Sequence, residues 1–431
     1  MPKRINPFQA IYLMKANSFY LFVSAAVLFL SSCITSNEVT KYDYSYLYDE
    51  EQAIISPKYK IFHHSQDSST LFYELNSGDI LYERVWGDSA KAANIRMKYT
   101  LFADRDLTII LDSGGQNLAN YGANGQQKLL QNAVRFKFDR RELAWLTIRF
   151  RDENKDFNVI NILEADKREN TNNQYFNYLN GEQVLFDQRS VTNRLSIEKS
   201  SLIEADEFIM ETSNKVFNMT PPPFARPMDH ELRVVADDRY SFSFINDFFQ
   251  QENPAPYNRF FSTIDSVLYN HIFYFGTQFP KLNQITEFID PIRYISTSTE
   301  YKNLKAAVNP KKGLDAFWLK LGKNEANSKE LLKEYYHRIE IANKFFTSYK
   351  EGWKTDRGII YIIYGIPNSI RKNAGNEVWL YGEENNVLSV QFRFYQTERS
   401  NISNHYEMVR NSDYKNNWYR QVDFWRQGKI D

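Results

Sequence analysis

The sequence predicts a mainly β protein with a C-terminal α+β domain: two immunoglobulin-like β-sandwiches followed by helices packed on a small antiparallel sheet. Between about residues 55 and 278, apolar and polar residues alternate in short segments, as in strands that bury one face. After about residue 285 the apolar spacing becomes that of amphipathic helices, and alternating segments then return. Aromatic residues make up 16% of the chain, which is typical of a strand-rich globular protein.

The N-terminal segment begins with basic residues and then becomes apolar. An apolar stretch of about 12 residues, 19–30, is too short for a permanent membrane-spanning helix. Leu30-Ser31-Ser32-Cys33 resembles the lipobox of lipoprotein precursors, in which the cysteine is lipidated after the preceding peptide is removed. We therefore expect a signal peptide at 1–32 and lipid, palmitate included, on Cys33, which would anchor the chain to a membrane.

Two other interpretations of this segment stay open: an ordinary secretory signal with an incidental cysteine, and an uncleaved anchor helix. Met14 is an alternative start of the chain. Cys33 is the only cysteine, which excludes an internal disulfide and a metal site built from several cysteines.

The residues after Cys33 bear on location and partners. Ile34, rather than the aspartate that retains many Gram-negative lipoproteins at the inner membrane, predicts the outer membrane, and we expect the periplasmic face rather than the cell surface. Removing residues 1–32, which hold three basic residues, would leave 50 basic and 53 acidic residues in a chain of 399. That balance gives no electrostatic reason to expect nucleic acid as a partner.

Residues 33–54, rich in tyrosine, are expected to form a tether, and residues 55–166 the first β-sandwich. Segments 94–102, 133–138, 146–150 and 157–163 alternate as strands do, and stretches 112–115 and 121–125 predict turns. A polar boundary at 167–173 precedes the second sandwich, 175–280, with strands expected at 207–211, 231–235, 240–244 and 272–275. Asp237 and Asp238 read as a hairpin turn, and the prolines of 220–223 with Pro227 predict an edge or an extended linker.

Residues 285–431 are expected to form the α+β domain. Short helices are predicted at 297–307 and 314–319, and a longer helix has one apolar face made by Leu331, Tyr335, Ile339, Ala342, Phe346 and Tyr349. Gly352 is placed where a C-terminal cap would follow. The apolar run 359–364 predicts a buried strand, with further strands at 376–381 and 387–394; in the last, Leu388, Val390, Phe392 and Phe394 are expected to face inward.

Gly352-Trp353-Lys354-Thr355-Asp356 resembles the signature of the GWxTD domain family. Further positions agree in order: Phe317-Trp318, Arg338-Ile339, Ala342-Asn343 and Phe346 before it, and Arg357-Gly358, Tyr361-Ile362, Tyr364-Gly365 with Pro367, and Glu377, Trp379 and Tyr381 after it. The resemblance covers about residues 285 to 400. It implies an architecture and an envelope lipoprotein, but no established biochemical activity. Ile366 departs from the family's preference for proline or a small residue, which affects the shape of a turn.

Two interpretations of this motif are open. In the structural one, Gly352 adopts a left-handed conformation, Trp353 folds over the helix end, and Gly358 admits the chain to a buried strand. Thr355 and Asp356 would then accept hydrogen bonds from loop N–H groups, and Arg357 would pair with Asp356 or Glu377. In the other, a binding surface for a sugar or peptide is lined by Trp353, Thr355, Asp356, Arg357, Tyr364, Trp379 and Tyr381.

No established catalytic motif is present in the sequence, and no catalytic residue, metal or cofactor is predicted. His63 and His64 are adjacent, would point to opposite faces of a strand, and are expected at the surface. We therefore expect a non-enzymatic binding or scaffolding module that recruits an envelope protein or glycan. The alternatives are a carbohydrate-binding lipoprotein and an envelope enzyme acting on glycans or peptides.

Overall fold

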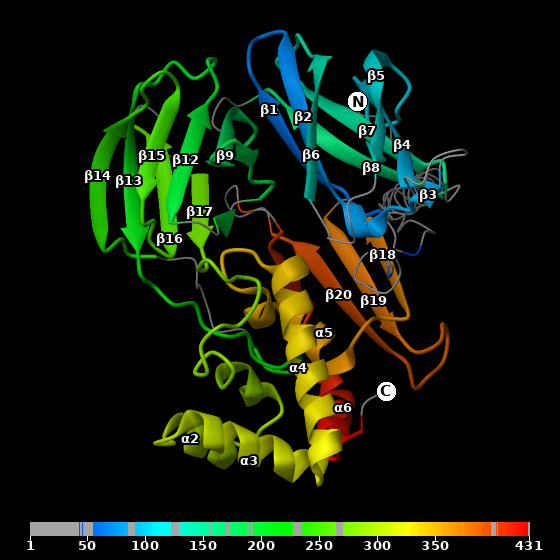
Figure 1. The fold of residues 1–431 in the computed structure, drawn as a ribbon, viewed down its shortest axis with the longest axis vertical. Coiled ribbons are helices and arrows are strands. Elements are labelled where there is room, and N and C mark those ends of the chain that lie inside the picture. Colours follow the sequence, from blue (N-terminus) through cyan, green and yellow to red (C-terminus); the bar gives the residue numbers. More distant parts are fainter. Residues whose placement is uncertain are drawn as a thin grey trace, which may run out of the picture. The chain divides into compact units, whose positions relative to one another are not determined.

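The computed structural model describes residues 43, 45, 55–84, 91–121, 129–154, 157–168, 173–187, 189–190, 193–226, 234–263, 270–373, 375–397, 402 and 404–429 (Figure 1). They belong to one compact unit, Tyr42–Asp431. The expected signal peptide, Cys33 and nearly all of the expected tether lie outside the described residues. Within the described ranges, no helix is both long and apolar enough to span a membrane.

The first β-sandwich consists of two sheets that share one apolar core. One sheet has the order β1-β2-β6, and the other contains β3, β4, β7 and β8, with β5 paired to β4. The core holds Leu71, Tyr73, Met97, Leu146, Ile148 and Phe150 from both sheets, all fully buried. The strands are β1 Lys58–His63, β2 Ser68–Asn76, β3 Glu83–Arg84, β4 Lys91–Phe102, β5 Ile110–Tyr121, β6 Leu129–Lys137, β7 Leu143–Asp152 and β8 Phe157–Asp166, with a 3-10 turn η2 Ser77–Asp79.

Two expectations for this sandwich were wrong. The turn expected at 112–115 lies inside β5, where Gly114 and Gly115 stand opposite Tyr99 and Lys98. A Cβ on Gly114 would come within 2.7 Å of the Tyr99 ring, so these glycines permit a close strand contact and do not mark a turn. His63, expected at the surface, is fully buried, and its ring nitrogens lie 2.8 Å from Ser69 Oγ and 2.9 Å from Gln174 Oε1.

The second β-sandwich has sheets of order β10-β9-β12-β15 and β11-β17-β16-β13-β14, with a shared core rich in phenylalanine. The pairing is antiparallel except between β11 and β17. Its strands are β9 Phe176–Asn180, β10 Gln183–Val184, β11 Arg189–Ser190, β12 Arg194–Lys199, β13 Glu207–Ser213, β14 Asp238–Ser243, β15 Phe248–Glu252, β16 Tyr257–Ser262 and β17 Asn270–Tyr274, preceded by a 3-10 turn η3 Asn173–Tyr175.

The expected hairpin at Asp237 and Asp238 was also wrong. β14 begins at Asp238 and pairs with β13, and Val234 and Val235 are irregular; residues 231–233 of the expected strand lie outside the described residues.

The C-terminal region packs helices on an antiparallel sheet of order β18-β19-β20-β21 (Figure 1). One core joins the helices to the sheet, with Trp318, Ile339, Trp379 and Phe392 almost fully buried. The elements are η4 Asp290–Tyr294, α2 Ser298–Lys305, α3 Pro310–Gly322, α4 Glu325–Phe346, η5 Gly352–Lys354, α5 Asp356–Tyr364, β18 Ser369–Asn373, β19 Asn376–Tyr381, β20 Val390–Gln396, β21 Tyr406–Met408 and α6 Tyr414–Arg426. The predicted fold class, mainly β with a C-terminal α+β domain, is confirmed.

Local signals start these helices where the sequence places them. Thr297 and Glu300 form a capping box at α2, in which each side chain bonds the backbone N–H of the other. Asn309 caps α3, whose first residue is proline, and Asn324 caps α4.

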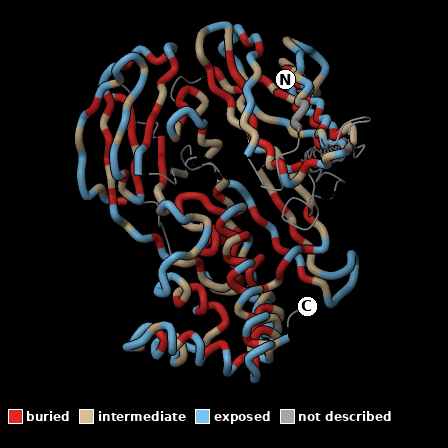
Figure 2. The backbone as a smooth tube through the Cα atoms, viewed as in Figure 1, coloured by how far each residue is buried: buried red, intermediate tan, exposed pale blue. Residues whose placement is uncertain are grey.

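The apolar run 359–364, expected as a strand, lies in helix α5. A short apolar run without alternation fits either a buried strand or a buried helix. Here Thr355 caps the helix and Gly365 follows it with a φ of 79°, so both ends have helix signals. All residues of α5 except the last are buried and are coloured red in Figure 2. Because the helix is enclosed on every side, its apolar run shows no alternation with polar residues.

Two smaller expectations also failed in this region. α4 ends at Phe346 with Thr347 as its cap, so Gly352 is not the cap. β20 begins at Val390, and Leu388, expected to face inward, is 70% exposed in the preceding turn.

Candidate functional site

The glycines of the Gly352–Asp356 motif allow two backbones to touch. A Cβ on Gly352 would lie 1.8 Å from the carbonyl oxygen of Ala342 in α4. A Cβ on Gly358 would lie 1.8 Å from the carbonyl oxygen of Gly352 itself. Real Cβ atoms never come so close, so both positions require glycine for packing and not for a left-handed backbone. The close approach presses η5 and α5 against α4.

Polar groups of the motif then tie these elements together. The backbone N–H of Trp353 donates to Asn343 Oδ1 of α4 at 3.2 Å, and Trp353 is 5% exposed. Thr355 Oγ1 donates to the Gly352 carbonyl at 2.7 Å and accepts the Gly358 N–H at 3.0 Å, which caps α5. The tryptophan and the threonine therefore fix the turn between α4 and α5.

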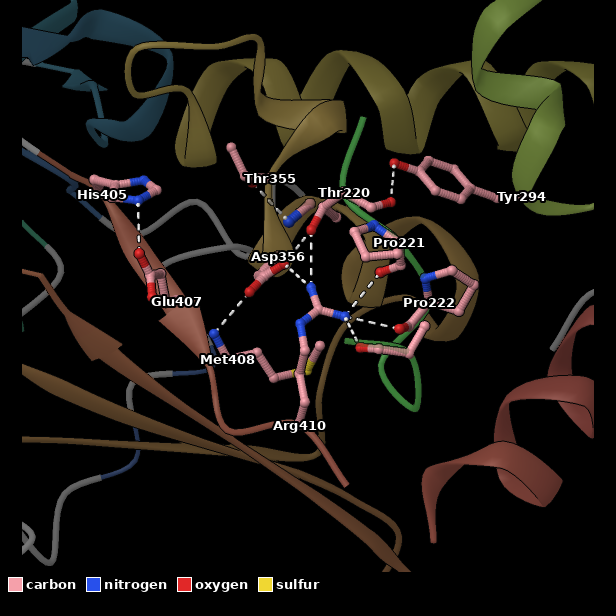
Figure 3. Close-up of polar contacts among 12 residues, drawn as sticks. Thr220, Pro221, Pro222, Tyr294, Thr355, Asp356, His405, Glu407, Met408 and Arg410 are labelled. Carbon is pink, nitrogen blue, oxygen red and sulfur yellow. Dashed lines mark hydrogen bonds and ion pairs between the residues drawn. The ribbon is translucent and has the colours of Figure 1, made fainter. Parts of the chain in front are cut away.

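Asp356 joins three segments that are far apart in the sequence (Figure 3). Its Oδ2 accepts the Met408 N–H of β21 at 2.7 Å. Its Oδ1 accepts hydrogen bonds from Thr220 Oγ1 and, at 2.5 Å, from Arg410 Nη2. We call Asp356, Thr220, Met408 and Arg410 the Asp356 cluster. Because the aspartate is 9% exposed, these donors supply the solvation that water would otherwise give the charge.

Arg410 extends the cluster to the proline-rich segment 220–225. Its Nη1 donates to the carbonyl oxygens of Pro221, Pro222 and Ala225 at 3.0, 2.7 and 3.2 Å (Figure 3). Prolines have a carbonyl acceptor but no N–H, so a guanidinium with several donors suits this segment. The segment lies in no strand and turns at Pro222–Ala225, where the Ala225 N–H donates to the Pro222 carbonyl, and the cluster fastens it to the C-terminal domain.

Arg357 lies in a second buried cluster under the sheet. Its Nη1 is 3.0 Å from Glu377 Oε1, and its guanidinium lies 4.0 Å from the centre of the Tyr406 ring. Burial by itself would raise the pKa of Glu377, but the Lys372 ammonium and the Arg357 guanidinium outweigh it and lower the pKa to about 2. The Trp379 indole N–H donates to the other carboxylate oxygen at 3.0 Å. This pair therefore stays charged inside the domain.

A groove with a volume of about 620 Å³ opens between α4, the end of α5, the β19–β20 hairpin and α6. Ile341, Ile363, Phe424 and Trp425 give it apolar walls, and the exposed Leu388 lies at its rim. This is the volume of a cleft that accepts a small molecule or a short segment of another chain.

Two tyrosines of the groove differ in their hydrogen bonding. The Tyr381 hydroxyl donates to the Gly365 carbonyl at 2.9 Å. The Tyr364 hydroxyl is buried and has no hydrogen-bond partner among the described residues. Burial also raises the pKa of Tyr364, so its hydroxyl stays protonated and can donate. A buried hydroxyl without a partner is costly, so Tyr364 loses stability that Tyr381 keeps.

The charged residues that line the groove are mostly basic. Arg338 Nε is paired with Glu334 Oε1 at 2.5 Å, so these two charges cancel. Arg420 and Lys429 add two exposed positive charges from the C-terminal end of the chain, and His337 lies across from them on α4. The groove therefore favours a ligand with a negative charge.

The described part of the chain contains no group of three or more histidine, cysteine, aspartate or glutamate side chains placed to hold a metal ion. What the site offers is a basic rim and apolar walls, which suit binding.

Residues 259–427 match the sequence model of the GWxTD domain. This chain contains a GWxTD domain. The match begins before the motif's own helices, in β16, and ends just after α6. The Asp356 cluster apart from Thr220 and the groove apart from Lys429 therefore belong to the GWxTD domain.

Other comparisons add little about function. No curated protein matches the chain. Among solved structures, β-glucuronidase 2 of Bacteroides uniformis bound to a cyclophellitol aziridine has 12% identity and a TM-score of 0.18, covering 26% of this chain and 13% of that one. A calcium-binding mutant of the same enzyme has 12% identity and a TM-score of 0.17, covering 25% and 12%. The chain thus spans about an eighth of these enzymes, and similarity at this level supports no argument.

The seven residues expected to line one binding surface divide into two groups. Trp353, Thr355, Asp356, Arg357 and Trp379 of the GWxTD domain are at most 9% exposed and bond to protein groups, so they do not form an open surface. Tyr364 and Tyr381 do line the groove. The interpretation of the motif as structural fits the first group, although Gly352 and Gly358 act by close contact.

Sequence reasoning missed the other groove residues, chiefly Arg338, Leu388, Arg420 and Lys429. They come from α4, from the turn before β20, from α6 and from the residues after α6, and α6 was not predicted at all. A helical spacing of Trp418, Val422 and Trp425 was the available signal for α6.

Proposed function

We propose that this protein is a lipid-anchored envelope protein whose GWxTD domain binds another envelope component, without catalysis, in the groove beside Tyr364. The observation on which this rests is the groove itself, in which the exposed charges of Arg420 and Lys429 lie at the rim of apolar walls. Apolar walls with a few charged groups are typical of ligand pockets.

The ligand's chemistry follows from the groove walls. Arg420 and Lys429 favour a negatively charged group, and the apolar surface of Phe424, Trp425 and Ile341 favours an aliphatic or aromatic body next to it. A segment of another envelope protein with an acidic residue or terminal carboxylate beside an apolar side chain meets both requirements.

The lipid anchor is supported by the N-terminal sequence: basic residues, a short apolar stretch and Leu30-Ser31-Ser32-Cys33. Metabolic labelling with palmitate tests it. We expect label on the native chain and none on Cys33→Ser, and label on both would contradict the anchor. Fractionation of the native chain to the outer membrane tests the proposed location.

Site-specific photo-crosslinking in intact cells tests the groove. A photoreactive amino acid replaces Leu388, which is 70% exposed at the groove rim, and in a matched control it replaces Val308, which is fully exposed in the α2–α3 loop. We expect one defined adduct from position 388 and none from position 308.

Charge reversal separates a specific ligand from chance contact. Adding Arg420→Glu should abolish the adduct at 388, because the new carboxylate cancels the charge of Lys429 and leaves the groove without net attraction for a negative ligand. An adduct that survives Arg420→Glu, or one of equal yield from position 308, would contradict the proposal. A glycan rather than a protein in the adduct would favour the carbohydrate-binding alternative.

A further inference from the structure

The outer face of the five-stranded sheet in the first sandwich gathers positive charge. β4 buries Ile95, Met97 and Tyr99, so the residues between them, Arg96 and Lys98, project outward and are exposed. β7 alternates in the same way, and Arg149 and Arg151 are exposed. The register of the two strands places Arg96 directly opposite Arg151 and Lys98 directly opposite Arg149.

This two-by-two block of cations does not stabilise the fold. Like charges directly opposite one another on neighbouring strands repel. Glu153 lies 3.3 Å from Arg96 and 3.0 Å from Arg151 and so offsets part of one row. For Lys98 and Arg149, the described residues provide no acidic partner. The second row therefore has no counter-charge within the described protein.

Apolar side chains border the cations on the same face. On the neighbouring edge strand β8, Ile160 stands opposite Arg149 and Ile162 opposite Thr147, and they are 52% and 54% exposed. Further along the sheet, Ile110 pairs with Phe102 and is 62% exposed, and Phe102 pairs with Trp145. One end of the face is thus mostly apolar and aromatic, although the exposed Glu164 stands opposite Trp145 there, and the rows beside it are basic.

We propose that this face of the first sandwich binds the surface of a membrane rich in anionic lipid. Basic residues next to exposed isoleucines and a tryptophan match the two layers of a membrane surface, phosphate groups and acyl chains. A soluble acidic polymer would account for the cations but would leave the isoleucines in water. The proposal goes beyond ligand binding in the groove and does not depend on lipid at Cys33; in an anchored chain it would fix the orientation of the sandwich.

Vesicle co-sedimentation tests it with the chain lacking its first 33 residues, which retains the whole of the compact unit Tyr42–Asp431. We expect sedimentation with vesicles of phosphatidylglycerol and phosphatidylcholine in equal parts, little with phosphatidylcholine alone, and release by salt. Each basic residue near an anionic surface contributes about fivefold to partitioning, so Lys98→Glu, which changes the face by two charges, should weaken binding at least about tenfold.

Controls separate this surface from general charge and from misfolding. Lys312→Glu, an exposed position at the start of α3, makes the same change of charge and should leave binding within about twofold. Lys98→Glu replaces a repulsive pair by an attractive one with Arg149, so its melting temperature should not fall. Paired Ile160→Ser and Ile162→Ser should also weaken binding.

Three results would overturn the proposal. They are no sedimentation with anionic vesicles, equal loss in Lys98→Glu and Lys312→Glu, and binding to soluble dextran sulfate but not to vesicles. The last would assign the face to an acidic polymer.

Discussion

Replacing Asp356 with alanine should destabilise the protein by about 3 kcal/mol, near the lower end of the 3–5 kcal/mol that follows when one partner of a buried ion pair is removed. Asp356 accepts from Thr220, Met408 and Arg410, and each loses its acceptor in the variant. Arg410 keeps the carbonyls of the 220–225 segment, which is why the lower end applies.

Urea unfolding of the chain without its first 33 residues measures this change. The control is Glu325→Ala, which removes an ion pair with Lys329 whose side chains are 80% and 72% exposed and should leave the midpoint unchanged. A loss below about 1 kcal/mol for Asp356→Ala, the range of exposed ion pairs, would refute the role given to the Asp356 cluster.

Further predictions concern packing, the groove and pH. Gly358→Ala should cost at least about 1–3 kcal/mol of unfolding free energy because its Cβ meets the Gly352 carbonyl, whereas Gly313→Ala in α3 meets nothing closer than 3.3 Å and should be neutral or stabilising. Tyr364→Phe should leave the free energy of unfolding unchanged or raise it by up to about 1 kcal/mol, since it removes a buried unbonded hydroxyl; a urea midpoint measures the change. Burial lowers the pKa of His63 and His271 to about 3, against 6.5 when unfolded, so the unfolded chain binds more protons between these values and stability should fall as pH drops below about 6.5. The slope is at most about 1.4 kcal/mol per pH unit for each histidine, and His63→Gln should reduce it in urea titrations between pH 6.5 and 5; an unchanged slope would contradict the assignment.

Alternation and helical spacing were enough to predict most of the fold, because a strand with one exposed face and a helix with one apolar face each give the sequence a regular period. The prediction of a strand at 359–364 was wrong for the opposite reason. Because α5 is buried on every side, its sequence has no helical periodicity, and only Thr355 and Gly365 distinguish it from a strand. The turn predicted at Gly114 and Gly115 was wrong because the sequence does not distinguish a glycine that allows a close strand contact from a glycine in a turn.

The site was less predictable than the fold. Arg357 pairs with Glu377, which is one of the two acids that the sequence analysis named as its partner. The partners of Asp356 were not predicted: Thr220, Met408 and Arg410 lie 136, 52 and 54 residues away, in segments that no sequence pattern connects to the motif. The groove is formed by the packing of α6 near α4 and the β19–β20 hairpin, and local sequence patterns do not predict this packing.

The central claim is that the motif of the GWxTD domain holds the fold while the groove beside Tyr364 binds the ligand. The most direct test measures melting temperature and crosslink yield from position 388 together, in Asn343→Ala, which removes the acceptor for the Trp353 N–H, and in Arg420→Glu. We predict a lower melting temperature for Asn343→Ala with the adduct retained below its melting point, and an unchanged melting temperature with the adduct lost for Arg420→Glu. The reverse pattern, adduct lost at unchanged stability in Asn343→Ala and retained in Arg420→Glu, would contradict the claim and make the motif the recognition element.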